Sequence, residues 1–77
     1  SGKGAALKRL AQHLQIPIAR TMSAGDQDND ISMLEAAGLG VAMCNGSQRA
    51  RDAADVITKT DNNHDGLVPF LESFFAL

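Results

Sequence analysis

Three carboxylates and two carboxamides lie within residues 26–30, whose sequence is Asp-Gln-Asp-Asn-Asp. The short apolar run 21–24 before them predicts the end of a strand, and a helical pattern follows at Ile31, Leu34 and Ala37. The acidic groups are thereby placed at the carboxyl end of a strand, where open parallel sheets bind ligands. Clustered carboxylates repel each other unless a cation or a lysine is present. Oxygen ligands suit Mg²⁺, which takes one or two carboxylates and keeps several waters. The segment therefore predicts a metal and phosphate site.

Hydrophobic spacing along the rest of the chain predicts alternating helices and strands. Helices are expected at about residues 4–15, 29–37, 47–54 and 67–74, and strands at about residues 20–24, 40–43 and 55–58. Gly38 is expected to cap the second helix at its carboxyl end, and Ser47 to cap the third at its amino end. Strand–helix–strand units imply parallel pairing with right-handed crossovers. The fold class is therefore α/β.

Composition excludes several classes of partner and places the chain in one domain at most. The 77 residues carry a net charge of −2 and no Trp or Tyr, which gives no reason to expect nucleic acid or an anionic membrane as a partner. No apolar run approaches the roughly 18 residues of a membrane span. The single cysteine, Cys44, excludes an internal disulfide, fits a reducing cytoplasm and is expected to be buried and inert.

The order of the motifs closely resembles that of haloacid dehalogenase-like (HAD) phosphatases, most of all their Cof-type sugar-phosphatase branch. Residues 25–43, GDQDNDISMLEAAGLGVAM, resemble the fourth motif of this superfamily. Lys3 and the helix that it opens resemble the third-motif lysine and its helix. The strand at 56–58, followed by Asn62, Asp65 and Gly66, is similar to the terminal strand and loop.

This resemblance implies the carboxyl-terminal half of a HAD-type Rossmann-like core, with about three parallel strands and flanking helices. The nucleophilic aspartate of the first motif, the second motif and the cap domain have no counterpart in residues 1–77. Residues 28–32 do spell an Asp-x-Asp-x-Ser pattern, but they lie inside the fourth motif without an apolar strand directly before them. We therefore expect the chain to be the carboxyl-terminal portion of a longer enzyme.

The resemblance also implies a role for each site residue. Asp26 would hold Mg²⁺, and Asp30 would lie in the outer metal shell or pair with Lys3. Lys3 and Asn29 would bind the phosphate of the substrate, whereas Asp28 is expected to be a cap or a surface charge. The implied activity is that of a cytoplasmic, Mg²⁺-dependent phosphatase for small phosphorylated metabolites, with sugar phosphates the first guess. An aspartate outside this chain would form the aspartyl-phosphate.

Two alternatives stay open. Other HAD branches, such as the phosphoserine phosphatases, carry similar Gly-Asp-x-x-Asn-Asp motifs. Residues 61–72 also satisfy the EF-hand pattern Asp-x-Asn-x-Asp-Gly-x₅-Glu, although a strand instead of a helix is expected before them.

The strand at 20–24 is expected to present an unpaired edge, because the family places it beside the absent first strand. Unpaired edges are templates for pairing with another chain. The isolated chain is therefore expected to self-associate through this edge or to be loosely folded.

Overall fold

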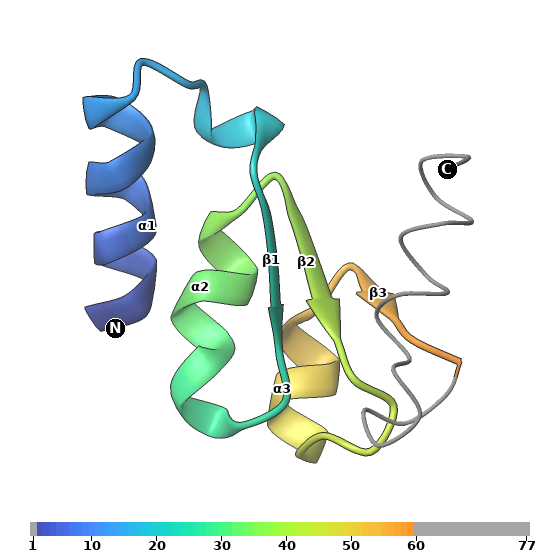
Figure 1. Cartoon of the computed structure of the whole chain (residues 1–77). Coiled ribbons are helices and arrows are strands. Elements are labelled where there is room, and N and C mark those ends of the chain that lie inside the picture. The colour runs from blue at the N-terminus through green and yellow to red at the C-terminus, as the bar shows by residue number, and fades with distance from the viewer. Residues whose placement is uncertain (1, 60–77) are drawn as a thin grey trace.

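The computed structural model describes residues 2–59, which form a helix followed by a three-stranded parallel sheet with helices between its strands (Figure 1). The strands follow the order β1-β2-β3 in both sequence and space. The elements are α1 (Gly2–His13), the 3₁₀ turn η1 (Ile18–Arg20), β1 (Met22–Gly25), the 3₁₀ turn η2 (Asp28–Asp30), α2 (Ile31–Ala36), β2 (Leu39–Ala42), α3 (Gln48–Ala53) and β3 (Val56–Ile57). The predicted α/β class with three parallel strands is thus confirmed.

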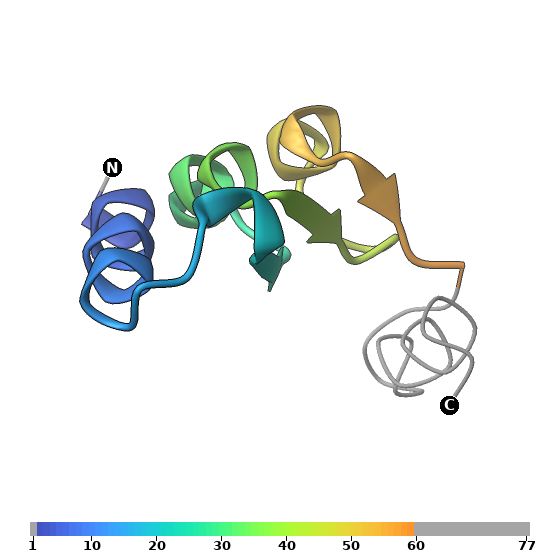
Figure 2. The same cartoon turned by 90° about the horizontal axis from the view of Figure 1, so that it is seen from above.

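Both connecting helices lie on the same face of this sheet (Figure 2). Each crossover steps one strand in the same direction, from β1 through α2 to β2 and then through α3 to β3. Since parallel crossovers are almost always right-handed, two steps in one direction place both helices on one face. The paired registers, Gly25 with Ala42 and Ala42 with Ile57, align the carboxyl ends of all three strands. The loops after β1 and β2 therefore meet at one edge.

The core between this sheet and its helices is small and consists largely of short side chains. Leu34 of α2 and Val41 of β2 are its largest fully buried side chains. Ala42 and Ala50 are completely buried beside them, so α3 lies close to β2. A Cβ built on Gly40 would lie 2.2 Å from the Leu34 carbonyl oxygen. A glycine at this position is what lets α2 pack directly on β2.

The first helix packs mainly against α2, and it uses small residues for this contact. Gly4 and Ala11, seven positions apart, are its buried residues. A Cβ on Gly4 would lie 2.6 Å from the Ser32 carbonyl oxygen, and the Gly4 N–H donates to Ser32 Oγ at 3.0 Å. By contrast Leu10 and Leu14, which belong to the predicted apolar spacing, are more than half exposed. The apolar spacing predicted the helix but not which side of it is buried.

Gly38 does not have the predicted role of a left-handed C-terminal cap. Ala37 is the C-cap of α2 in extended conformation, and Gly38 has no positive φ. A Cβ built on Gly38 would lie 2.1 Å from the Ala19 carbonyl oxygen. Glycine is therefore required here because the chain passes close to η1. The left-handed cap belongs to α1: Gln15 has φ 59°, and Ile16 and Gln15 donate to the carbonyls of Ala11 and Gln12. This is the Schellman arrangement, here formed without glycine.

The remaining differences from the predicted elements are shifts of the ends. The first helix begins at Gly2 and ends at His13, the second begins with the 3₁₀ turn η2, and β3 has two residues instead of four. The Ser47 cap is confirmed, because its side chain accepts from the Ala50 N–H. The predicted helix at 67–74 and the EF-hand pattern at 61–72 lie outside the described residues. Among residues 2–59 no helix is long and apolar enough to cross a membrane.

Candidate functional site

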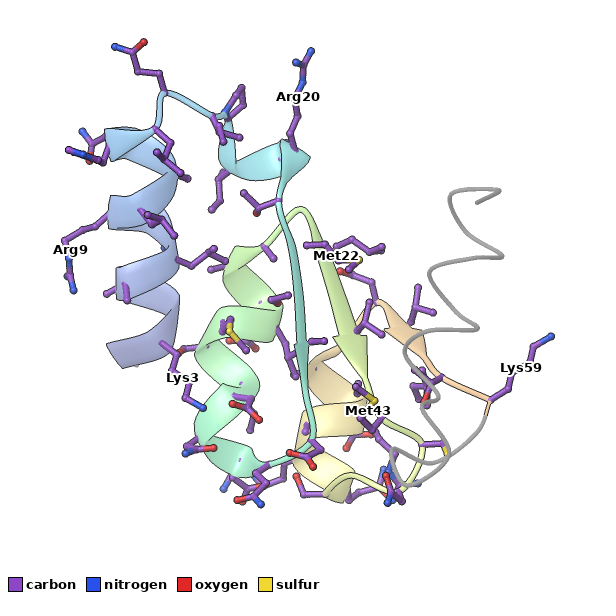
Figure 3. The ribbon with its side chains drawn as sticks, in the orientation of Figure 1. Lys3, Arg9, Arg20, Met22, Met43 and Lys59 are labelled. Carbon is purple, nitrogen blue, oxygen red and sulfur yellow. The ribbon has the colours of Figure 1, made fainter. Side chains whose placement is uncertain are left out.

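An ion pair joins the first turn of α1 to the start of α2. Lys3 Nζ lies 2.5 Å from Asp30 Oδ1, across 27 positions of sequence. Figure 3 shows the Lys3 side chain directed from α1 toward the start of α2. The Asp30 side chain is 9% exposed and that of Lys3 is 49% exposed. The carboxylate is thus buried while the lysine keeps one side open to solvent.

The other carboxylate oxygen of Asp30 orders the turn that follows β1. Asp30 Oδ2 accepts from the main-chain N–H groups of Asp26, at 3.0 Å, and Gln27, at 3.1 Å. A Cβ on Gly25 would lie 2.5 Å from the Asp30 Cβ, so only glycine lets the carboxylate lie against this turn. The hydrogen bond from Lys3 lowers the pKa of Asp30, which burial alone would raise, and the two main-chain donors lower it further. Asp30 is therefore a buried anion at neutral pH.

Asp26 lies directly after β1, at the carboxyl edge of the sheet, and it is partly exposed. Together with residues from the loop after β2 it lines an open hollow. The lining residues are Asp26, Gln27, Asp28, Asn45 and Ser47. Every side chain in this set carries an oxygen, which is the ligand atom that Mg²⁺ prefers. Asn45 and Ser47 were not among the predicted site residues, although their place after the neighbouring strand β2 could have indicated them.

Main-chain hydrogen bonds fasten the loop after β2 to the loop after β1. The Met43 N–H donates to the Gly25 carbonyl at 3.2 Å, and the Ser47 N–H donates to the Asp26 carbonyl at 2.8 Å. Gly46 also lies close to Asp26: a Cβ built on this glycine would be 2.8 Å from the Asp26 carbonyl oxygen. The two loops therefore form one layer of backbone at the edge of the sheet.

Side chains add a second connection between these loops. Ser47 Oγ donates to Asp28 Oδ1 at 2.6 Å and accepts from the Ala50 N–H at 3.1 Å. Arg49 Nη1 lies 3.6 Å from Asp28 Oδ2, in an exposed ion pair. Asp28 is thus a surface charge, as predicted, but it also contacts the residue that caps α3.

The sequence prediction and the structure differ most at Cys44. Its side chain is partly exposed, whereas we had expected it to be buried. Its main chain is held in place: the Cys44 N–H donates to Thr58 Oγ1 at 3.1 Å, and the Thr58 N–H donates to the Ala42 carbonyl. Thr58 is itself 3% exposed. This contact ties the loop after β2 to the end of β3.

Of the four predicted site residues, the structure brings three together. Lys3 contacts Asp30, and Asp30 contacts the main chain of Asp26. Asn29 lies on η2 between them in sequence, with its side chain exposed at the same edge of the sheet. Within residues 2–59, no three His, Cys, Asp or Glu side chains come close enough to hold a metal ion by themselves.

Sequence comparison assigns residues 1–71 to the family described as haloacid dehalogenase-like hydrolase. The chain is 52% identical over 64 residues to phosphatase YwpJ of Bacillus subtilis, a match that covers 83% of this chain and 22% of that protein. It is 40% identical over 75 residues to 5-amino-6-(5-phospho-D-ribitylamino)uracil phosphatase YitU of the same organism, covering 97% of this chain and 27% of YitU.

Comparison with solved structures gives the same relationship. The fold matches the HAD subclass IIB sugar phosphatase BT4131 with a TM-score of 0.89 and 34% sequence identity, covering 96% of this chain and 28% of that structure. The chain therefore spans about a quarter of the length of the relatives that it matches.

Proposed function

This chain belongs to the haloacid dehalogenase-like hydrolase family, and we propose that it carries the metal- and phosphate-binding part of a phosphatase for small phosphate monoesters. Sugar phosphates are the first substrate class to test, because a structural relative is described as a sugar phosphatase. The nucleophilic aspartate would lie outside these 77 residues, since the Asp-x-Asp-x-Ser pattern at residues 28–32 lies inside the fourth motif and has no apolar strand directly before it.

One observation supports this proposal above the others: the buried Asp30 carboxylate connects Lys3 to the turn that carries Asp26. An ion pair of this kind adds little to stability alone, because solvent screens the half-exposed Lys3 and the desolvation of the buried Asp30 carboxylate offsets part of the attraction. Here the pair has a further effect, because it places a cation and a second carboxylate at the same edge of the sheet. A phosphate monoester bound beside Mg²⁺ requires both charges at close range.

The oxygen-rich hollow around Asp26 fits Mg²⁺ in its donor chemistry, and Asp26 is the residue that we propose as its ligand. When bound, Mg²⁺ would orient the nucleophile and screen the charge that develops on the phosphoryl group. Asp30 would act from the outer shell, because both of its oxygens already accept hydrogen bonds. Its contribution is to hold the Asp26 N–H and the Lys3 ammonium in place.

Lys3 is suited to contact a phosphate as well as Asp30. An ammonium group has three donors, and the bond to Asp30 uses one of them. The exposed half of the side chain leaves the others accessible to a ligand. Asn29, exposed on η2, would donate its amide to another phosphoryl oxygen.

Titration of the 77-residue chain with Mg²⁺, followed by NMR, tests this proposal. We expect weak binding, in about the millimolar range, because one protein carboxylate with several waters is a sparse coordination shell. The shifts should concentrate at Asp26 and disappear in Asp26→Asn, while Asp52→Asn, an exposed carboxylate of α3, should bind as the wild type does. Micromolar Ca²⁺ binding that perturbs residues 61–72 instead would support the EF-hand alternative and count against this one.

A further inference from the structure

Both polar main-chain groups of Asp26 are held by residues from other segments. Its N–H donates to Asp30 Oδ2 at 3.0 Å, and its carbonyl accepts from the Ser47 N–H at 2.8 Å. A residue whose N–H and C=O are both fixed has little freedom in φ and ψ, so the direction of its Cα–Cβ bond, from which the side chain extends, is fixed as well. Positions of reacting groups must be held to fractions of an ångström, so such a restraint matters at a metal site.

The Ser47 side of this restraint depends on Asp28. The Ser47 hydroxyl has one proton, and it donates that proton to Asp28 Oδ1 at 2.6 Å. The short distance is typical of a hydroxyl bound to an ionised carboxylate. Ser47 Oγ also accepts from the Ala50 N–H, so Ser47 is held both by α3 and by the loop after β1. Arg49 Nη1 lies 3.6 Å from the other Asp28 oxygen, Oδ2.

We propose that Asp28 is a positioning residue for Asp26. By accepting from Ser47 Oγ it holds the Ser47 N–H against the Asp26 carbonyl, and it thereby restrains the main chain from which the Asp26 carboxylate extends. The importance of that direction for catalysis rests on the proposed function, whereas the restraint itself does not.

A simpler role for these residues makes a different prediction. If Ser47 only caps α3 and Asp28 is only a surface charge, the cap needs the Ser47 oxygen but not Asp28. Removal of the Asp28 side chain would then leave the Ser47 N–H as well protected as before. The main-chain bond between Ser47 and Asp26 is thus the quantity to measure.

Amide hydrogen exchange in metal-free solution measures this bond directly. In Asp28→Ala we expect the Ser47 amide to lose roughly fivefold in protection, the effect of one hydrogen bond of typical net strength. Asp28→Asn should stay close to the wild type, because its side-chain oxygen still accepts from Ser47 Oγ. Asp52→Ala, which removes an exposed carboxylate elsewhere on α3, is the matched control, and the buried amide of Val41 reports the overall fold. Unchanged protection of Ser47 in Asp28→Ala would overturn the proposal.

Ser47→Gly provides the same test from the other partner, in case Asp28→Ala does not fold. Glycine is nearly as good an N-cap as serine, but it lacks the hydroxyl that reaches Asp28. We expect the amide of residue 47 to lose a similar factor in protection, after correction for its intrinsic exchange rate. Protection equal to that of the wild type would again refute the positioning role.

Mg²⁺ titration of the same variants separates position from charge. Asp28→Ala should weaken Mg²⁺ binding roughly fivefold, and Asp28→Asn should weaken it less. Equal weakening by both variants would show that only the charge of Asp28 matters, and this result too would overturn the proposal. A wild-type chain that does not bind Mg²⁺ would count against the proposed function, while the exchange experiment would still decide whether Asp28 positions Asp26.

Discussion

Lys3 and Asp30 form a 2.5 Å ion pair in which the carboxylate is buried and the ammonium is half exposed. The pair connects α1 to the turn between β1 and α2, two parts of the chain that are 27 positions apart. Asp30 uses its second oxygen to order the main chain of Asp26 and Gln27. A contact at the end of a helix thereby determines the shape of a turn that we assign to metal binding.

Loss of the lysine should destabilise the fold to a measurable extent. In Lys3→Met the buried Asp30 keeps its two main-chain donors but loses its counter-ion, and we expect the free energy of unfolding to fall by about 1 kcal/mol. The value is modest because the exposed side of Lys3 is screened by solvent. Urea denaturation measures it, with Lys8→Met, an exposed lysine of the same helix, as the control. Equal effects of the two substitutions would contradict a specific role for the pair.

The same pair predicts how stability depends on pH. The pKa of Asp30 is lower in the folded chain than in the unfolded chain, where it is about 3.9. Its contribution is therefore fully present above pH 4 and is lost as the pH falls through the lower folded pKa. We expect the difference in unfolding free energy between wild type and Lys3→Met to shrink below about pH 4. Urea curves at several pH values test this, and a difference that stays constant down to pH 2 (about two units below the ordinary pKa) would refute it.

The close packing of α1 on α2 makes Gly4 sensitive to a single added carbon. The new Cβ of Gly4→Ala would lie 2.6 Å from the main-chain oxygen of Ser32, so the helices must separate. Overpacking of this kind costs about 1–3 kcal/mol, and the better helix propensity of alanine offsets part of it. Gly2→Ala, in the same helix but with nothing within 4 Å, should be neutral or slightly stabilising. Thermal unfolding of both variants checks this, and equal melting temperatures would argue against the close contact.

The isolated 77-residue chain should not hydrolyse phosphate esters. Asp26, Asn29 and Lys3 are proposed to bind metal and phosphate, but no residue here is proposed as the nucleophile. An assay with a generic phosphate ester and Mg²⁺ should give no turnover above a sample without the chain. Turnover that Asp26→Ala abolishes would show that these residues suffice for catalysis, and the division of roles proposed above would be wrong.

The outer edge of β1 should promote self-association of the chain. Within residues 2–59 β1 pairs only with β2. The carbonyls of Thr21 and Gly25 accept from the β2 side, so by alternation the main-chain groups of Met22 and Ala24 face the other edge. Ala24→Pro removes one of these outward N–H groups without a loss to the β1–β2 ladder, and it should reduce association.

Sedimentation at several concentrations measures this effect, with Ala24→Gly as the control that keeps the N–H. Hydrogen exchange over residues 21–24 provides a second measurement. A strictly monomeric chain with strong protection across this strand would show that the edge is closed in another way.

The sequence by itself determined the order and type of the elements from α1 to β3. Apolar spacing and turn residues are local properties, and they predicted the parallel α/β arrangement as well as the Ser47 cap. The fourth-motif resemblance also indicated Asp26 and Asp30 before their contacts were known. The apolar spacing, the turn residues and the fourth motif each extend over a short stretch of the chain, so they could be interpreted without knowledge of the tertiary structure.

The resemblance allowed for a pairing of Lys3 with Asp30, but the other contacts across the fold were decided only by the tertiary structure. The close approach of Gly38 to Ala19, the exposed Leu10 and the bond between Asp28 and Ser47 all depend on how two crossovers place separate segments side by side. Spacing along the chain carries no information about contacts between residues 19 or more positions apart, because such contacts are fixed by the packing of the whole sheet and its helices. For this reason Asp28 looked like a surface charge in the sequence, and its contact with Ser47 became visible only in the folded chain.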